Sequence, residues 1–202
     1  MRIIKLFKNH VLALVAAVAL IVISCNADLA LPNYMSEIVD VGIQQGGIES
    51  PVPDTIRADS LADLEMFMSD EDTATVEAAF GPADANGVRA YTGSAADRAE
   101  DGAVANAMSL PETVALALQQ GIDASTVNGS MTLDMDSVRA AVEAGMLPKE
   151  QLVEAAGSMS DAMGSMGGSI VKQRAVSYVQ QEYEAQGISL EDVQNSYLAS
   201  MA

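Results

Sequence analysis

The sequence predicts an all-α protein, in which one long N-terminal transmembrane helix projects beyond the bilayer and a small helical extracytoplasmic domain follows. Hydrophobic residues make up 50% of the 202 residues, but there is no tryptophan and there are only three phenylalanines. Because strands draw on aromatic and β-branched side chains, this composition favours helices. A charge-free run near the N-terminus and an acidic remainder are the other two observations.

The first ten residues form a basic flank that contains Arg2, Lys5 and Lys8. All 28 acidic residues follow the apolar run with only seven basic ones, which leaves an excess of 21 acidic residues there. Basic residues before a membrane span favour a cytoplasmic N-terminus. The acidic excess opposes contact with nucleic acid and anionic lipid headgroups, so we expect no nucleic-acid partner.

The apolar run "VLALVAAVALIVIS" covers 11–24, and "CNADLAL" extends it to Leu31. A span needs about 20 residues, which the extended run provides. Apolar and polar residues then alternate with helical period as far as Gln45. We therefore expect one kinked helix over 11–45, about 52 Å long, of which roughly 20 Å lies outside the bilayer. Leu31, Tyr34, Met35, Ile38, Val39 and Gly42 are expected on its apolar face, and Asn33, Ser36, Glu37, Asp40 and Gln44 on its polar face.

Three residues of this helix are candidates for a helix-bundle contact or a substrate path: Asn26, Asp28 and Pro32. Asn26 and Asp28 would lie near the outer edge of the bilayer. Pro32 leaves the carbonyl of Asp28 without its usual donor and should bend the axis. An acid at such a depth normally points into a helix bundle or a wet cavity, so we expect neighbouring membrane helices.

A signal peptide is the alternative interpretation of the N-terminus. A basic start, a short apolar core and "VISC" at 22–25 fit a bacterial lipoprotein that is cleaved before Cys25. The chain would then be a secreted acidic lipoprotein that is anchored through Cys25 and acts as a binding module. The helical period after Cys25 favours the membrane helix, because a lipoprotein usually follows its cysteine with a flexible polar tether.

Two stretches carry a resemblance to a known family. "DLALPNYMSEIVDVGIQQGGIE" at 28–49 resembles the first transmembrane helix of bacterial ABC exporters of the multidrug ATP-binding/permease type. The subgroup concerned has a large extracytoplasmic insert between its first and second transmembrane helices. "VPDTIR" at 52–57 and "LEMFMSDED" at 64–72 resemble the start of that insert, and "AVSYVQQEYEAQGISLEDVQNSYLASMA" at 175–202 resembles its close.

The resemblance implies partners that lie outside this chain: the remaining transmembrane helices, a nucleotide-binding domain and a second exporter half in the bacterial cytoplasmic membrane. The glycine-rich phosphate loop G-x-x-x-x-G-K-[ST] does not occur in the sequence. We therefore expect no cofactor and no enzymatic activity in this chain, with ATP and Mg²⁺ bound only by the nucleotide-binding domain. The chain would be a fragment, a truncated product or one part of a split exporter for small molecules, drugs or peptides.

Residues 46–58 are predicted to be a linker, because glycines end the long helix and prolines follow. Residues 59–202 should form the acidic helical domain, loop-rich over 81–107. Local signals predict helices from Ser109, as a cap, to Gly121, over 133–144, from Pro148 to Ala156, over 170–186, and from Ser189 to the C-terminus. The domain should also bring Gln44 close to Ser196, because neighbouring membrane helices require an insert to leave and return at one place.

Candidate metal sites have simpler interpretations. "DEDTATVEAAF" and "DMDSVRAAVEAG" begin as calcium loops do, but they have Thr75 and Arg139 where glycine is required, so solvated helix starts are favoured. Met159, Met163 and Met166 could offer thioethers to copper(I), but packing is favoured, since the only histidine is His10 in the basic flank. We therefore assign no catalytic residue and no metal ligand.

Overall fold

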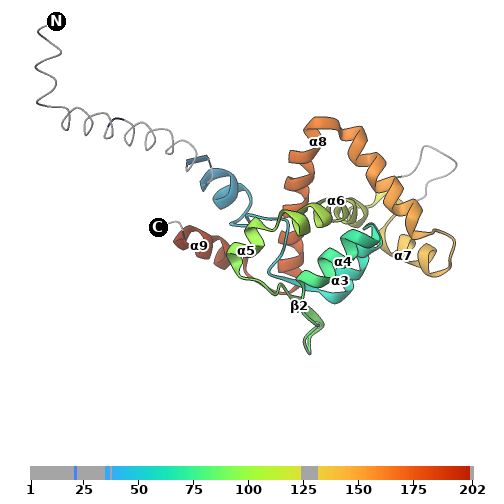
Figure 1. The fold of residues 1–202 in the computed structure, drawn as a ribbon, viewed down its shortest axis with the longest axis horizontal. Coiled ribbons are helices and arrows are strands. Elements are labelled where there is room, and N and C mark those ends of the chain that lie inside the picture. The colour runs from blue at the N-terminus through green and yellow to red at the C-terminus, as the bar shows by residue number, and fades with distance from the viewer. Residues whose placement is uncertain (1–20, 22–34, 37, 124–131, 201–202) are drawn as a thin grey trace, which may run out of the picture.

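The fold is mostly helical, as predicted, with two short pairs of strands (Figure 1). A computed structural model describes residues 21, 35–36, 38–123 and 132–200. Most of the N-terminal apolar run, with Cys25 and the candidate residues Asn26, Asp28 and Pro32, lies outside these described residues. Within them, no helix has both the length and the apolar character that a membrane crossing requires.

Short strands and helices of very different lengths follow one another along the described chain. A π-helical segment η1 (Ile38–Gln44) leads to strand β1 (Thr55–Arg57) and the helices α3 (Ala58–Glu65) and α4 (Asp70–Ala79). Strand β2 (Val88–Ala90) pairs antiparallel with β1 and precedes α5 (Ala95–Glu100) and α6 (Gly102–Gln119). The strands β3 (Ile122–Asp123) and β4 (Thr132–Leu133) form a second antiparallel pair before α7 (Met135–Glu143), α8 (Lys149–Ala185) and α9 (Leu190–Ser200).

Polar side chains cap the starts of several helices of the acidic domain. Ser69 accepts a hydrogen bond from the Asp72 amide at the start of α4, and Asp134 accepts one from the Ser137 amide at the start of α7. The two aspartate-rich sequences are therefore helix starts, as predicted. Acidic residues in a first turn also interact favourably with the helix dipole.

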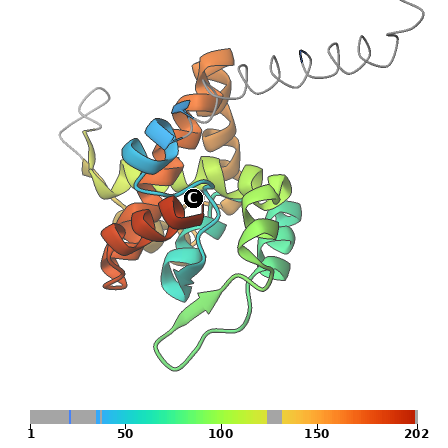
Figure 2. The same cartoon turned by 90° about the vertical axis from the view of Figure 1, so that its left-hand side faces the viewer.

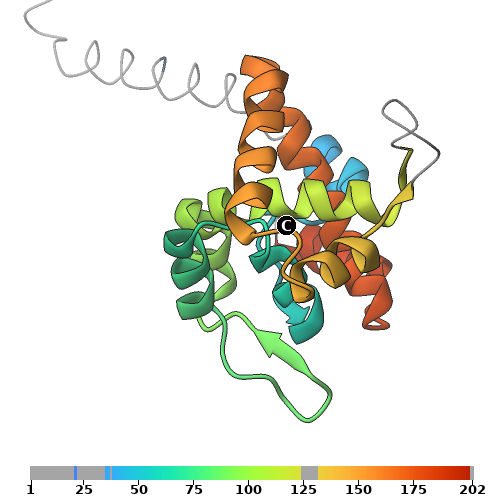
Figure 3. The same cartoon turned by 90° about the vertical axis from the view of Figure 1, so that its right-hand side faces the viewer.

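The core forms where α6 packs against α8, α4 and α3 (Figure 3). Its largest fully buried side chains come from segments far apart in the sequence. They include Val52, Ile56, Leu61, Leu64, Met68, Val76 and Met108. Aliphatic and methionine side chains thus supply the burial that aromatic residues supply in many domains.

Two segments predicted to be irregular are ordered parts of the domain. The expected linker 46–58 buries Ile48, Val52 and Ile56 and contributes β1, because its apolar residues complete the core. The expected loop 81–107 contains α5 and the first turns of α6. A reciprocal capping box of Ser94 and Asp97 starts α5, and burial of Val104 holds the early part of α6.

The start of α6 also differs from the prediction. Asp101, not Ser109, caps this helix, and Pro111 lies inside it. The Ser109 hydroxyl donates to the carbonyl of Ala105, one turn back. Burial of the helix on both sides of Pro111 outweighs the lost backbone hydrogen bond, so the local capping signal was misleading.

A single helix, α8, replaces the two that we expected over 148–186. Figure 1 shows that it bends and returns towards the domain. Both of its arms are held by buried side chains, Leu152 and Ala156 in one and Val171 and Ala175 in the other. Packing of the two arms explains why the glycine-rich stretch between them continues the helix. The side chains of Met159, Met163 and Met166 lie outside the described residues.

Candidate functional site

The two ends of the described chain meet where η1 lies beside α9 (Figure 2). The Gln194 side-chain amide donates to the carbonyl of Gly42. A Cβ atom on Gly42 would lie 3.2 Å from Cδ2 of Leu198, and one on Gly47 would lie 2.8 Å from Cα of Gln194. Gly47 also has a φ of +82°, which favours glycine. The segment η1, which contains Gln44, and the helix α9, which contains Ser196, therefore lie side by side, as expected for the two ends of the domain.

The segment that includes η1 has three distinct sides. Gly42 is buried against α9, while Met35, Val39 and Ile43 expose 63%, 42% and 63% of their surfaces. On a third side Asp40 accepts hydrogen bonds from the Ser36 hydroxyl at 3.0 Å and the Gln44 amide at 3.3 Å. The sequence placed Gly42 on the same face as Met35 and Val39. In the structure Gly42 is buried, whereas Met35 and Val39 are exposed, so the three residues do not share one environment.

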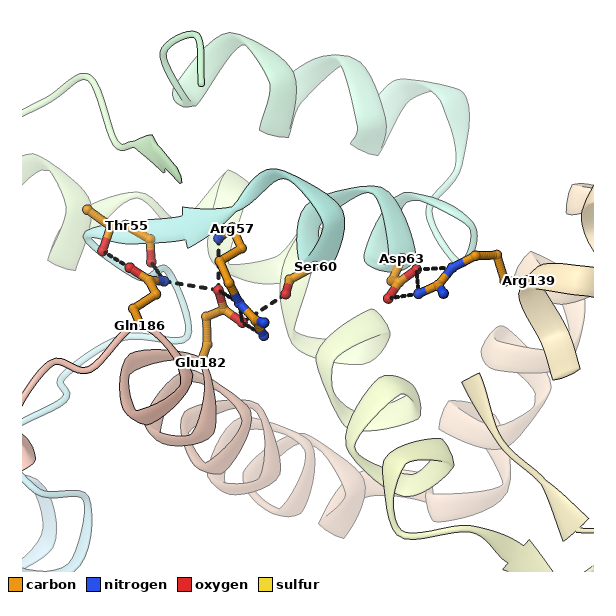
Figure 4. A network of polar contacts seen from close by, with 7 residues as sticks. All are labelled: Thr55, Arg57, Ser60, Asp63, Arg139, Glu182 and Gln186. Atoms are coloured by element: carbon orange, nitrogen blue, oxygen red, sulfur yellow. Dashed lines mark hydrogen bonds and ion pairs between the residues drawn. The ribbon is translucent and has the colours of Figure 1, made fainter. Parts of the chain in front are cut away.

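The segment after η1 is anchored to α8 by Glu182 (Figure 4). Glu182 is only 3% exposed. Its Oε1 accepts hydrogen bonds from the Arg57 backbone amide at 2.8 Å, from Arg57 Nε at 3.0 Å and from Gln186 Nε2 at 2.9 Å. Its Oε2 accepts from Arg57 Nη2 at 2.9 Å and from the Ser60 hydroxyl at 2.9 Å. Gln186 extends the network to Thr55, since the Thr55 hydroxyl donates to its Oε1 at 2.8 Å.

These contacts keep Glu182 ionised. Burial alone would raise its pKa, but the hydrogen bonds from Arg57, Gln186 and Ser60 together hold the pKa below its usual value. Both carboxylate oxygens already accept several hydrogen bonds, so neither is open to a substrate. The arrangement is suited to joining β1 and α3 firmly to α8, and not to acid–base chemistry.

A second tether holds the segment just before β1. The Asp54 backbone amide donates to the Tyr183 hydroxyl at 2.7 Å. The Asp54 carboxylate lies 2.6 Å from Arg98 Nε, and Arg98 also donates to the carbonyl of Val52 at 2.7 Å. Helices α5 and α8 therefore both fix the stretch that connects η1 to the domain.

A pair of carboxyl groups lies between α3 and α4. Burial, followed by a hydrogen bond to Glu77, raises the pKa of Glu65 to about 7. Arg89 donates to both oxygens of Glu77, at 2.7 and 2.9 Å. These bonds, followed by the one from Glu65, lower the pKa of Glu77 to about 2. Glu65 therefore titrates near neutral pH, and its protonated form donates a hydrogen bond to the ionised carboxylate of Glu77.

A hollow with a volume of about 500 Å³ lies between the end of α5, the first half of α6 and the second arm of α8. Glu49, Glu100, Asn106, Ser109 and Lys172 line it with apolar groups between them. None of the described residues that line it is a histidine or a cysteine. Among the described residues, no group of three or more histidine, cysteine, aspartate or glutamate side chains is placed to hold a metal ion. The hollow thus offers polar contacts but no arrangement that defines a reaction.

Sequence reasoning missed the polar residues that organise this domain. Arg57 and Glu182 are 125 positions apart, so no local pattern could pair them. Comparison with known proteins gave no match: no protein-family model, no curated protein and no solved structure matches this chain.

Proposed function

We propose that the chain contributes the first transmembrane helix and an external domain to a bacterial ABC exporter of the multidrug type. The observation that carries the proposal is the contact of η1 with α9. An insert between two neighbouring membrane helices must begin and end side by side. The described domain begins and ends in this way, with the Gln194 amide bonded to the carbonyl of Gly42.

The anchored segment between η1 and α3 supports the same role. Glu182, Tyr183 and Arg98 leave little freedom to the stretch that joins η1 to the domain. A movement of the N-terminal helix would then be transmitted to the domain as a whole. In a transporter, such a rigid connection lets the external domain follow the membrane helices as they move between their two orientations.

In this proposal the chain is not an enzyme. ATP hydrolysis takes place in a nucleotide-binding domain outside this chain, and it drives export of small molecules, drugs or peptides. The chain lines the outer part of the substrate path and shapes the external gate, with Asn26, Asp28 and Pro32 facing the other membrane helices. The N-terminus is cytoplasmic and residues from about 46 onward are extracytoplasmic.

The second candidate is a lipoprotein anchored through Cys25, in which the acidic domain is a binding module. The "VISC" sequence favours it. Both candidates place the domain outside the cytoplasm, so exposure of the domain alone does not separate them.

Labelling in bacterial cells tests the proposal. In a Cys25→Ser background, a membrane-impermeant maleimide should label Met146→Cys in intact spheroplasts, because this side chain is 75% exposed. A cysteine that replaces Lys5 should be retained in the chain, and the reagent should label it only after the membrane is permeabilised. Absence of residue 5 from the mature form of the unaltered chain, which keeps Cys25, would favour the lipoprotein. A heat-sensitive ATPase activity of the purified chain alone would contradict the proposal.

A further inference from the structure

One acidic side chain, Glu112, lies in the centre of the domain with nothing to compensate its charge. It sits in the middle of α6 and is 0% exposed. Neither Oε1 nor Oε2 has a hydrogen-bond partner among the described residues. Burying an ionised carboxylate without a partner is strongly unfavourable, so a neutral side chain is the form that this position can accept.

Glu182 provides an internal contrast, because it is nearly as well buried but receives hydrogen bonds on both oxygens. Glu182 on α8 therefore has the donors that an ionised carboxylate needs, whereas Glu112 on α6 has none among the described residues. Burial is the only cause that acts on Glu112, and it raises the pKa of this carboxyl well above its usual value.

The titratable groups around Glu112 give an ionised carboxylate no support. Tyr178 on α8 is 3% exposed; burial is the main cause of the raised pKa of its hydroxyl, and the carboxyl of Glu112 is one of the groups that add to it. The other charges that act on Tyr178 are those of Glu182 on α8 and Asp63 on α3, and both are negative. The cations of these networks, Arg57 and Arg139, are already bound to Glu182 and to Asp63.

The backbone of α6 is also weakened next to Glu112. Pro111 has no amide hydrogen, so the carbonyl of Ala107 lacks its usual helical donor. One turn further, the Thr113 hydroxyl contacts the carbonyl of Ser109 at 2.8 Å and that of Val171 on α8 at 3.1 Å. The contact between α6 and α8 therefore depends on side-chain packing around the position that Glu112 occupies.

We propose that Glu112 is a proton-binding site, which holds one proton while α6 is packed against α8 and loses it when this contact opens. The ligand is a proton from solvent, and no other reactant takes part. In the packed state the neutral acid fills a dry position. In the opened state water reaches the carboxyl group, which ionises and opposes reclosure. The inference does not depend on the exporter proposal, since it concerns only the domain core.

The sign of the pH dependence follows from linkage. The pKa of Glu112 is higher in the folded domain than in the unfolded chain. Its neutral form therefore contributes fully to the stability of the fold below about pH 4.5, and this contribution is lost as the pH rises towards the folded-state pKa. Over that interval one bound proton changes the unfolding equilibrium constant by up to tenfold per pH unit. Glu65 acts in the same direction up to about pH 7, so only a difference between variants isolates Glu112.

The test is denaturant unfolding of the full chain in detergent micelles at several pH values from 5 to 8. Glu112→Gln removes the ionisation with little change in size, and Glu154→Gln, on an exposed position of α8, is the matched control. Relative to Glu112→Gln, the unfolding constant of the unaltered protein should rise by about five- to tenfold per pH unit. Glu154→Gln should follow the unaltered protein. Identical pH profiles for all three proteins would overturn the proposal.

A direct measurement covers the case in which Glu112→Gln does not fold. Carbon-13 NMR of protein labelled at glutamate carboxyl carbons follows each group through its own titration. One signal should remain that of a neutral acid at pH values where the other glutamate signals, apart from that of Glu65, are those of ionised groups, and it should be absent from the spectrum of a folded Glu112→Asn variant. If every glutamate signal except that of Glu65 has shifted to the ionised position by pH 6, Glu112 does not hold a proton in the folded domain.

Discussion

Replacing Glu182 with alanine should strongly destabilise the domain, since this carboxylate joins β1 and α3 to α8. The Arg57 backbone amide and the Ser60 hydroxyl both donate to it, and Ser60 is itself only 7% exposed. After truncation these two donors remain inside the fold without their acceptor.

The magnitude follows from those two groups. An unsatisfied buried donor costs about 1–3 kcal/mol, so the loss for Glu182→Ala should be about 3 kcal/mol. The guanidinium of Arg57 adds little, because its side chain is 45% exposed and can turn towards water. Glu182→Gln keeps one acceptor oxygen and the size of the side chain, and should cost about 1–2 kcal/mol.

Urea unfolding followed by far-ultraviolet circular dichroism measures this change. With a slope of about 2 kcal/mol per molar urea, the alanine variant should unfold at a midpoint about 1.5 M lower. Asp63→Ala is the control, since it removes an ion pair with Arg139 that is partly exposed to water and worth about 1 kcal/mol or less. The reasoning would be refuted if Glu182→Ala lowered the midpoint no more than Asp63→Ala does.

Three further changes test other parts of the structure. Gly47→Ala should weaken docking of α9 by about 2–3 kcal/mol, because the new Cβ would clash with Gln194 and the backbone has a positive φ. Gly145→Ala is the control: its φ is also positive, but a Cβ there meets nothing within 4 Å, so it should cost only about 1 kcal/mol. Hydrogen exchange over residues 190–200 and the urea midpoint are measured for both variants. Equal losses of stability in Gly47→Ala and Gly145→Ala would contradict the contact between Gly47 and α9. The domain should lose stability between pH 5 and 8, because the fold favours the neutral form of Glu65 below its pKa of about 7. Glu65→Gln should make this loss smaller, and a pH dependence of the urea midpoint equal to that of the unaltered protein would contradict the prediction. Asp28→Leu should lengthen the lifetime of the chain expressed alone in a pulse-chase and impair efflux by the complete exporter, and failure of both would remove Asp28 from the bundle.

Helices with strong local signals were predictable from the sequence. The helix expected over 133–144 is α7, with the Asp134 cap at its start and Gly145, at a φ of +67°, after its end. The helix expected after Ser189 is α9, where the Asp192 amide donates to the Ser189 hydroxyl. In these cases the cap, the apolar period and the terminating residue all agree, so local energetics and tertiary packing favour one structure.

The remaining helices depend on contacts that no local pattern contains. Ser109, Pro111 and Glu112 have the spacing of a helix start, yet burial of the preceding turns places them inside α6. The same burial leaves Glu112 in the core, where its carboxyl has no hydrogen-bond partner among the described residues. The sequence shows the residue type, but its environment follows from the packing of α6 on α8.

The residues of the proposed membrane site stay at the level of prediction for a different reason. Asn26, Asp28 and Pro32 lie outside the described residues, and their assignment depends on spacing and on the family resemblance. The described domain bears on them only indirectly, through the side-by-side arrangement of η1 and α9.

Native mass spectrometry of the protein extracted from bacterial membranes tests the central proposal most directly. We predict a chain that retains residues 1–24, carries no lipid on Cys25, and is joined to or associated with further transmembrane helices and a nucleotide-binding domain. A free chain that begins at Cys25 and carries diacylglycerol on that residue would contradict the proposal and establish the lipoprotein.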